Sequence, residues 1–320
     1  MKLVLAAQAN SRFFHLLDDL KDEGVTVVEA FDDETLRAEI ADADALYGWP
    51  SASALAQAGR LRWIQTSSAG VDQLWSRPEL QEREVVITNT RGAHAPNIAE
   101  HAFALLLAFS RGVLVASEAQ AARRWEGTAV REVSWELAGS TLGIIGYGQI
   151  GRAVGARARG FEMEVIAVDR EAVAPDDAVA EVWPLGRLDD LLAAADVAVV
   201  TAPYTPQARG MLSAAQFATM KPDAGLIVVS RGGLVDHDAL IDALQDDEQG
   251  PAYAGLDATP TEPLPADSPL WGLPNCLITP HSSGHSRRKE RRAVEILREN
   301  ARRFAQGEPL INVVDKTRGY

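Results

Sequence analysis

The sequence predicts an α/β protein with two doubly wound parallel-sheet domains. The first observation is that short β-rich runs alternate with helical patterns up to about residue 90, which is typical of a parallel sheet covered on both faces. The second is that the alternation resumes after a glycine-rich turn near residue 146. The third is a helical pattern at 286–306 that is left over once the second sheet is complete.

The first run contains five predicted strands with helical patterns between them. The helical patterns lie near residues 11–22, 34–41 and 53–59. The predicted strands are Lys2–Ala6, Val25–Ala30, Ala45–Trp49, Arg62–Thr66 and Val85–Thr88.

A long helical pattern follows at residues 98–123 and is apolar nearly all round its middle. Such a helix must be buried between domains or between subunits. Residues 123–137, with Trp125 and Trp135, are predicted to form an irregular arm. The apolar surface of both segments predicts a homodimer formed through the second domain. The alternative is that the two domains of one chain bury both segments.

The second run contains six predicted strands, enough for a complete dinucleotide-binding sheet. Helical patterns near 188–195, 213–220 and 236–246 separate the later strands. The strands are expected near 142–146, 164–168, 197–202, 225–230, 252–257 and 276–279. Two segments remain after this sheet, the helix at 286–306 and the strand-like Leu310–Val314, and they most simply return to the first domain. We therefore expect one domain of residues 1–97 plus 285–320 and another of residues 98–284.

The glycine-rich turn has the spacing of a dinucleotide-binding fingerprint. Gly146 allows a tight turn after a strand, Gly148 lets the backbone approach a pyrophosphate, and Gly151 lets the next helix pack closely. Asp169 ends the following strand, where a carboxylate can accept hydrogen bonds from an adenosine ribose. The run Gly146, Tyr147, Gly148, Gln149, Ile150 and Gly151 is therefore predicted to bind NAD.

Composition limits the classes of function. The net charge is −14 and no basic run interrupts it, which argues against a nucleic-acid partner. The single Cys276 excludes an internal disulfide. The strongly apolar stretch at residues 102–109 is too short for a bilayer, and the N-terminal apolar run is too short for a signal peptide. We expect a cytoplasmic protein without a membrane partner or a metal.

Polar side chains follow three predicted strands of the second domain. Arg231 comes after the strand near 225–230, Asp257 ends the next strand, and His281 follows the last one. Glu262 lies five residues beyond Asp257. Because ligands of open α/β sheets gather at the carboxyl ends of the strands, these groups are expected to converge beside a nicotinamide.

The chain resembles the D-isomer-specific 2-hydroxyacid dehydrogenases from about residue 44 to 314. The resemblance rests on the order of several short motifs. They are Ser68-Ala69-Gly70-Val71-Asp72, Asn97-Ile98-Ala99-Glu100-His101, Thr201-Ala202-Pro203, Ser230-Arg231-Gly232-Gly233, Asp257 through Pro265, and Leu270-Trp271 through His281. It implies a Rossmann coenzyme domain inserted into a flavodoxin-like substrate domain.

The resemblance also implies roles for individual residues. His281 is the general acid that protonates the 2-oxo oxygen, because an imidazole ordinarily titrates near working pH. Glu262 favours the charged form of His281, and Arg231 binds the substrate carboxylate with its planar fork. Asp257 accepts from the nicotinamide carboxamide. Further expected coenzyme contacts come from Thr201, Pro203 and Ser230, and backbone N–H groups of Ser68, Ala69, Gly70 and Val71 are expected to bind the substrate carboxylate.

The function that follows is reduction of a small 2-oxoacid such as glyoxylate or hydroxypyruvate to the D-2-hydroxyacid. Asp169 favours NADH, with NADP(H) open because Arg170 is adjacent. A non-catalytic NAD(H)-sensing protein on the same fold is the alternative. The resemblance implies that a formate-oxidising relative would carry an amide beside the histidine, so Glu262 argues against formate oxidation. Phosphite oxidation stays open. Two departures from the usual pattern, Ala258-Thr259 and Ser282-Ser283-Gly284-His285, leave the substrate side chain undetermined.

Overall fold

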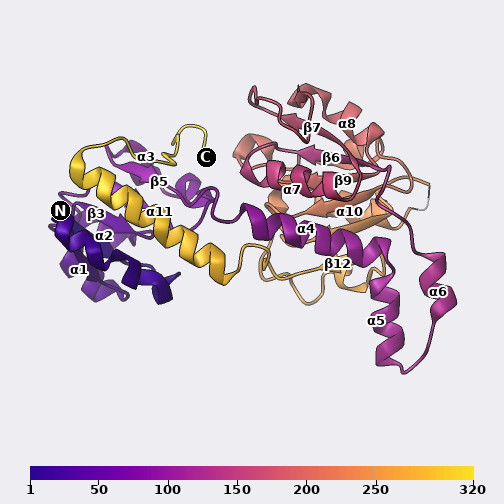
Figure 1. The fold of residues 1–320 in the computed structure, drawn as a ribbon, viewed down its shortest axis with the longest axis horizontal. Helices are drawn as coiled ribbons and strands as arrows, with labels where there is room; N and C mark the ends of the chain where they lie inside the picture. Colours follow the sequence, from indigo (N-terminus) through magenta and orange to yellow (C-terminus); the bar gives the residue numbers. More distant parts are fainter. Residues whose placement is uncertain (247) are drawn as a thin grey trace. The chain divides into compact units, whose positions relative to one another are not determined.

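The computed structural model describes residues 1–246 and 248–320. They form two compact units, one of residues Met1–His94 and His285–Tyr320 and one of residues Ala95–Gly284. Figure 1 shows the chain leaving the first unit, completing the second and returning to the first through the helix α11 (Arg287–Gln306). The unit boundary near residue 95 lies three residues before the domain boundary expected from the sequence.

The first unit contains a parallel sheet of order β2-β1-β3-β4-β5 in the described residues. This is the flavodoxin-like order 2-1-3-4-5, as expected. The strands are β1 (Lys2–Leu5), β2 (Thr26–Glu29), β3 (Ala45–Tyr47), β4 (Trp63–Gln65) and β5 (Val86–Thr88). The helices are η1 (Ser11–Glu23), α1 (Asp33–Ile40), α2 (Ala52–Gln57), η2 (Asp72–Ser76), α3 (Pro78–Glu82) and α11 (Arg287–Gln306).

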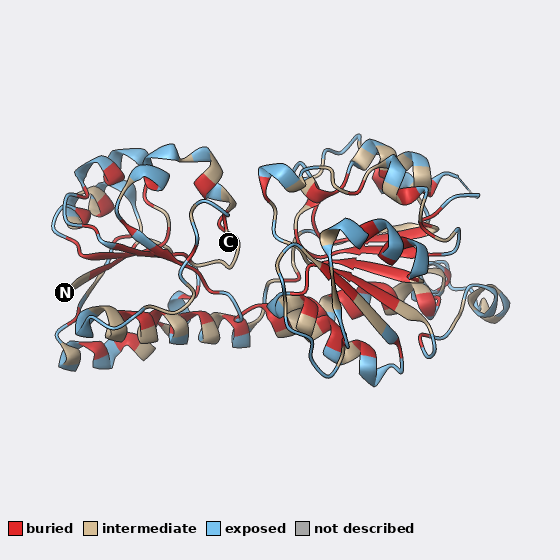
Figure 2. Ribbon diagram, turned by 90° about the horizontal axis from the view of Figure 1, so that it is seen from above, coloured by how far each residue is buried: buried red, intermediate tan, exposed pale blue. Residues whose placement is uncertain are grey.

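Alternate residues of the central strands supply the two hydrophobic cores of this unit. Leu3 and Trp63 pack on one face with Leu297 of α11. Val4 and Ile64 point to the opposite core, which α1 and α2 cover. Figure 2 shows the strands buried between outer helix faces that are exposed. The strand expected at Leu310–Val314 is wrong, because this segment makes only an isolated antiparallel bridge between Thr88 and Val313.

The second unit contains a parallel sheet of order β12-β11-β10-β9-β6-β7-β8 in the described residues. The sheet extends outward in opposite directions from β6 and β9, so the topological switch point lies between them. The strands are β6 (Thr141–Ile145), β7 (Glu164–Asp169), β8 (Val182–Pro184), β9 (Val197–Val200), β10 (Gly225–Val228), β11 (Tyr253–Leu256) and β12 (Cys276–Ile278). Six strands were expected; the short edge strand β8, half-buried and ending in proline, lacks the apolar run that marks the others.

Helices cover both faces of this sheet: α4 (Ala95–Ser110), α7 (Gln149–Gly160), α8 (Leu188–Ala194), α9 (Ala214–Phe217) and α10 (His237–Leu244). The helices α5 (Val113–Ala121) and α6 (Gly127–Glu132) contact each other and extend away from the sheet (Figure 1). Short 3₁₀ turns are η3 (Leu185–Arg187), η4 (Pro206–Ala208), η5 (Gly232–Leu234) and η6 (Pro269–Gly272). The fold class expected from the sequence is therefore confirmed.

The single long helix expected at residues 98–123 is wrong. The chain bends by 70° between α4 and α5. Gly112 at this break has φ +61°, and a Cβ there would lie 3.1 Å from the Val130 carbonyl oxygen. The expected irregular arm at 123–137 contains the short helix α6.

In the part of the chain that the structure describes, no single helix is long and apolar enough to cross a membrane. The bent pair α4–α5 meets that test of length and composition only when the two helices are taken together.

Candidate active site

The glycine turn follows β6 and is shaped by close approaches. Gly146 has φ +94°, and a Cβ on it would lie 2.5 Å from the Ala202 Cα. A Cβ on Gly151 would lie 2.4 Å from the Gly146 carbonyl oxygen. Both positions therefore require glycine, the first for its backbone conformation and both for space.

Gly148 differs, because a Cβ there would meet nothing within 4 Å. It is the N-cap of α7, and no side chain caps this helix. The amide groups of a first helical turn lack partners within the helix and favour an anion. Gln149 is exposed and Ile150 half-buried at this turn. Open space beside uncapped amides fits the pyrophosphate of a dinucleotide.

Asp169 at the end of β7 ties the glycine turn to the following loop. Its Oδ2 accepts from the Tyr147 amide at 2.7 Å and its Oδ1 accepts from the Glu171 amide at 2.9 Å. The buried Tyr147 hydroxyl donates to Asp176, which also pairs with Arg152 at 2.7 Å. Burial and the hydrogen bond to Asp176 raise the pKa of Tyr147. The expected ribose acceptor is thus held at the turn.

The other expected coenzyme residues lie in the loops after β9 and β10. The Thr201 hydroxyl donates to the Gly146 carbonyl and so stabilises the glycine turn. Pro203 is exposed two residues later. The Ser230 Oγ is buried and has no hydrogen-bond partner among the described residues. Buried hydroxyls are nearly always satisfied, so this atom fits a polar group of a bound coenzyme.

His281 and Glu262 form a direct pair. The distance between His281 Nδ1 and Glu262 Oε2 is 2.7 Å, and both side chains are about two-fifths exposed, at 41% and 39%. The other Glu262 oxygen accepts from the Thr259 amide at 3.0 Å, which fixes the carboxylate plane. Because Nδ1 faces the carboxylate, Nε2 is the ring nitrogen left for a reacting proton.

Arg231 lies beyond the end of β10, and its loop is pressed against the loop that carries Glu262. A Cβ on Gly232 would lie only 2.1 Å from the Thr259 carbonyl carbon. The Arg231 Nη1 donates to the carbonyl of Ser230 at 2.9 Å. The structure therefore brings the loops of Arg231, Glu262 and His281 together at one edge of the sheet.

Asp257 is 1% exposed and lies within a set of donors from its own unit. It accepts from the Thr279 hydroxyl at 2.6 Å and from the amides of Ser282 and Ser283 at 2.9 and 3.0 Å. His101 on α4 lies 3.3 Å from the same carboxylate. Sequence reasoning assigned Asp257 to the coenzyme and did not connect it with these neighbours, although His101 lies within one of the quoted motifs.

The expected substrate-binding segment, Ser68–Val71, belongs to the first unit and follows β4. The Ser68 carbonyl accepts from the Thr90 amide, and the Ala69 carbonyl accepts from Asn89 Nδ2 at 2.9 Å. The Ser68 hydroxyl donates to the Gly70 carbonyl. These bonds hold a compact turn at the carboxyl end of the sheet, whose contact with a substrate stays a prediction.

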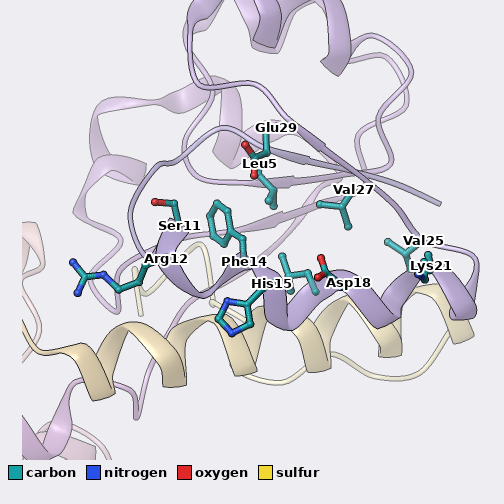
Figure 3. Close-up of a pocket in the computed structure, with 11 residues that line it drawn as sticks. Leu5, Ser11, Arg12, Phe14, His15, Asp18, Lys21, Val25, Val27 and Glu29 are labelled. Atoms are coloured by element: carbon teal, nitrogen blue, oxygen red, sulfur yellow. The ribbon is translucent and has the colours of Figure 1, made fainter.

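A separate hollow of about 500 Å³ lies in the first unit between η1 and the edge strand β2 (Figure 3). Its rim carries both signs of charge, from Arg12, Asp18, Lys21 and Glu29. The predicted site residues do not line it. Within residues 1–246 and 248–320, no group of three or more His, Cys, Asp or Glu side chains could hold a metal ion.

Known proteins are similar to this chain in sequence and in fold. Residues 103–283, more than half of the chain, match the family described as D-isomer specific 2-hydroxyacid dehydrogenase, NAD binding domain. A glyoxylate reductase from Korarchaeum cryptofilum is 34% identical over 264 residues, which cover 81% of this chain and 77% of that one.

Two further likenesses bear on length and fold. A D-3-phosphoglycerate dehydrogenase from Mycobacterium leprae is 35% identical over 88% of this chain, and the chain spans about half of that relative, 53%. The crystal structure of a D-isomer specific 2-hydroxyacid dehydrogenase from Xanthobacter autotrophicus, in complex with NADPH and MES, superimposes on this chain with a TM-score of 0.81. The two sequences are 28% identical, and the match covers 99% of this chain and 100% of that one.

Proposed function

Because the chain belongs to the D-isomer-specific 2-hydroxyacid dehydrogenase family, a family of oxidoreductases, we propose that it reduces small 2-oxoacids with NADH. The family match and the glyoxylate reductase relative confirm the family that the sequence motifs predicted. Glyoxylate and hydroxypyruvate are the proposed substrates, and the name of the glyoxylate reductase relative supports the first of them. The observation that carries the proposal is the His281–Glu262 pair at 2.7 Å, in the same unit as the glycine turn.

His281 is the proposed general acid. The carboxylate of Glu262 holds Nδ1, so Nε2 donates the proton to the 2-oxo oxygen during reduction and takes it back during oxidation. The negative partner stabilises the imidazolium form that reduction requires. Arg231 binds the substrate carboxylate, for which a guanidinium offers two parallel donors.

The residues around the glycine turn are proposed to bind the coenzyme, which when bound supplies the hydride. The uncapped amides of α7 beside Gly148 bind the pyrophosphate, and Asp169 binds the adenosine ribose. The orphan hydroxyl of Ser230 is proposed to donate to the nicotinamide half, with Thr201 and Pro203 lining the same side.

NADH is proposed as the preferred coenzyme. Asp169 carries a negative charge that repels a 2′-phosphate. The adjacent Arg170 forms an ion pair with Glu171, with 3.7 Å between Arg170 Nε and Glu171 Oε1. A guanidinium paired in this way attracts a 2′-phosphate less strongly than an unpaired one does. The Xanthobacter structure contains NADPH, so kinetics with both coenzymes decide the preference.

The two compact units are proposed to serve as substrate and coenzyme domains, with the amides of Ser68–Val71 contributing to carboxylate binding.

A homodimer is proposed to form through α4, α5 and α6. Trp125 between α5 and α6 is 100% exposed, and Val113 and Val133 nearby are also exposed. Such an apolar surface favours a partner copy. Light scattering at micromolar concentration tests this, and a stable monomer would contradict it.

The function is tested with purified protein and a panel of 2-oxoacids, assayed separately with NADH and NADPH. We expect turnover of glyoxylate or hydroxypyruvate, with a higher kcat/KM for NADH. In the reverse direction, D-2-hydroxyacids should be oxidised and their L-isomers should not. Tight NADH binding without turnover of any oxoacid would instead support the NAD(H)-sensing alternative.

A further inference from the structure

The loop that carries His281 has an uncommon backbone. His281 has φ +50°, a left-handed conformation that residues other than glycine rarely adopt. Such a conformation persists only where the surrounding structure fixes it. Its own amide bonds to the Thr279 carbonyl at 2.9 Å, which is a tight local turn and supplies only part of the restraint.

The next two residues are held by a buried carboxylate. Asp257 accepts from the amides of Ser282 and Ser283, one on each oxygen. The Ser283 carbonyl in turn accepts from Asn97 Nδ2 at 2.6 Å, at the start of α4. We call Asp257 and its donors Thr279, Ser282 and Ser283 the Asp257 clasp.

The clasp needs a donor from outside the loop. The single hydroxyl proton of Thr279 goes to Asp257 at 2.6 Å, so this oxygen can only accept from His101 Nε2, which lies 2.8 Å away. His101 Nε2 is also 3.3 Å from Asp257 Oδ1. Nε2 of His101 therefore carries a proton directed at the junction of Thr279 and the carboxylate.

We propose that His101 is a positioning residue for the catalytic loop: its Nε2–H orients Thr279 and Asp257, which hold Ser282 and Ser283 and so keep His281 in reach of Glu262. His101 belongs to α4, which packs on α7 and on β10 and β11 of the same unit. A rigid helix thus supports a loop that has no regular structure of its own. The catalytic consequence rests on the proposed function, whereas the structural one does not.

The expected consequence falls on turnover. A small misplacement of an acid–base group can reduce rate by about 100-fold. The coenzyme turn at Gly146–Gly151 and the carboxylate-binding Arg231 belong to other segments, and Asp257 keeps its three donors from the loop. Binding of NADH and of the oxoacid should therefore change little.

Three variants separate positioning from general stability. His101→Leu keeps similar bulk and removes the donor, whereas His101→Gln offers an amide N–H at similar reach. Glu100→Gln is the matched control, because Glu100 is the neighbouring residue of α4 and its exposed carboxylate pairs with Arg157 instead. The readouts are amide hydrogen exchange of residues 282–283, with β10 as internal reference, and kcat and KM of the full-length enzyme.

In His101→Leu we expect exchange of the Ser282 and Ser283 amides to rise about tenfold or more while β10 stays protected. We expect kcat to fall about 10- to 100-fold, with both KM values within about twofold. His101→Gln should recover most of the protection and turnover, and Glu100→Gln should match the wild type.

Unchanged protection of Ser282 and Ser283 in His101→Leu would overturn the proposal, as would equal impairment of the Leu and Gln variants or a rise of exchange across the whole sheet. If the wild-type protein reduces no oxoacid but His101→Leu still releases these two amides, the proposed function fails and the positioning role stands. If the wild type is active and His101→Leu alters neither exchange nor kcat, the positioning role fails alone.

Discussion

Two regions of the second unit lie beyond the carboxyl ends of its strands and are built differently. The glycine turn at residues 146–151 is one continuous segment whose shape is set by missing side chains. The His281 region is assembled from four segments, which carry His101, Arg231, Asp257 with Glu262, and Thr279 with His281. In the proposed function, backbone amides bind the ligand in the first region, and charged side chains bind it in the second.

The difference determines how each region can fail. At the glycine turn an added methyl group is harmful, because it occupies space that the backbone or a ligand needs. In the His281 region a removed group is harmful, because each polar side chain depends on a partner from another segment. Substitutions that add atoms in one region and remove them in the other therefore test the comparison.

The largest effect is expected for His281→Ala. Loss of a positioned general acid costs about 10² to 10⁴ in kcat. NADH binding should be retained, since the glycine turn and Asp169 are unaltered. Steady-state reduction of the best oxoacid gives kcat, and fluorescence titration gives the NADH affinity. Near-normal turnover by this variant would remove the proposed mechanism.

Arg231→Lys should act mainly on binding of the oxoacid. A charge-assisted hydrogen bond is worth about 1.5–3 kcal/mol, so loss of one arm of a bidentate contact should raise KM about 10- to 100-fold. An effect on kcat alone, with KM unchanged, would mean that Arg231 does not bind the substrate carboxylate. Lys221→Arg is a distant control, because Lys221 pairs with Asp196 at the opposite end of the strands.

Within the glycine turn, Gly148→Ala and Gly151→Ala form a matched pair. A Cβ at Gly148 meets nothing within 4 Å, so this variant should fold normally and raise the KM for NADH roughly tenfold, equal to about 1.4 kcal/mol. A Cβ at Gly151 would collide with the Gly146 carbonyl, so this variant should also lose thermal stability. A wild-type KM for NADH in Gly148→Ala would contradict the assignment of this open space to the pyrophosphate. An unchanged melting temperature of Gly151→Ala would contradict the predicted collision.

The same contrast explains what the sequence could predict. The glycine turn could be located from its local spacing, because close approach and positive φ are properties of single residues. The strands were found within a residue or two, apart from β8, which has only two apolar residues before a proline. The strand expected at Leu310–Val314 is not formed. The long helix at 98–123 was wrong because Gly112 terminates α4 in a left-handed conformation, and an apolar pattern cannot show a bend.

The Asp257 clasp could not be predicted in this way. Its members lie at positions 101, 257, 279, 282 and 283, and their contacts depend on how the sheet arranges β11, β12 and α4. The family resemblance named His281, Glu262 and Arg231 because their motifs are local. The motifs also contain His101, Asp257 and Thr279, but a motif does not show that these side chains contact one another, because the contacts depend on the fold.

The smallest effect is expected for Glu262→Gln. Gln keeps an oxygen acceptor for the Thr259 amide, so the loop should hold its shape while the negative charge beside His281 is lost. The 2.7 Å contact with Nδ1 would then come from an amide instead of a carboxylate, and a neutral partner forms a weaker hydrogen bond to the ring. In steady-state assays kcat for reduction should therefore fall by less than about tenfold, with the KM for NADH unchanged. Asp267→Asn removes the same charge from an exposed position in the same loop and should leave kcat unchanged. An unchanged kcat for Glu262→Gln would mean that the hydrogen bond to His281 does not depend on the charge of its partner.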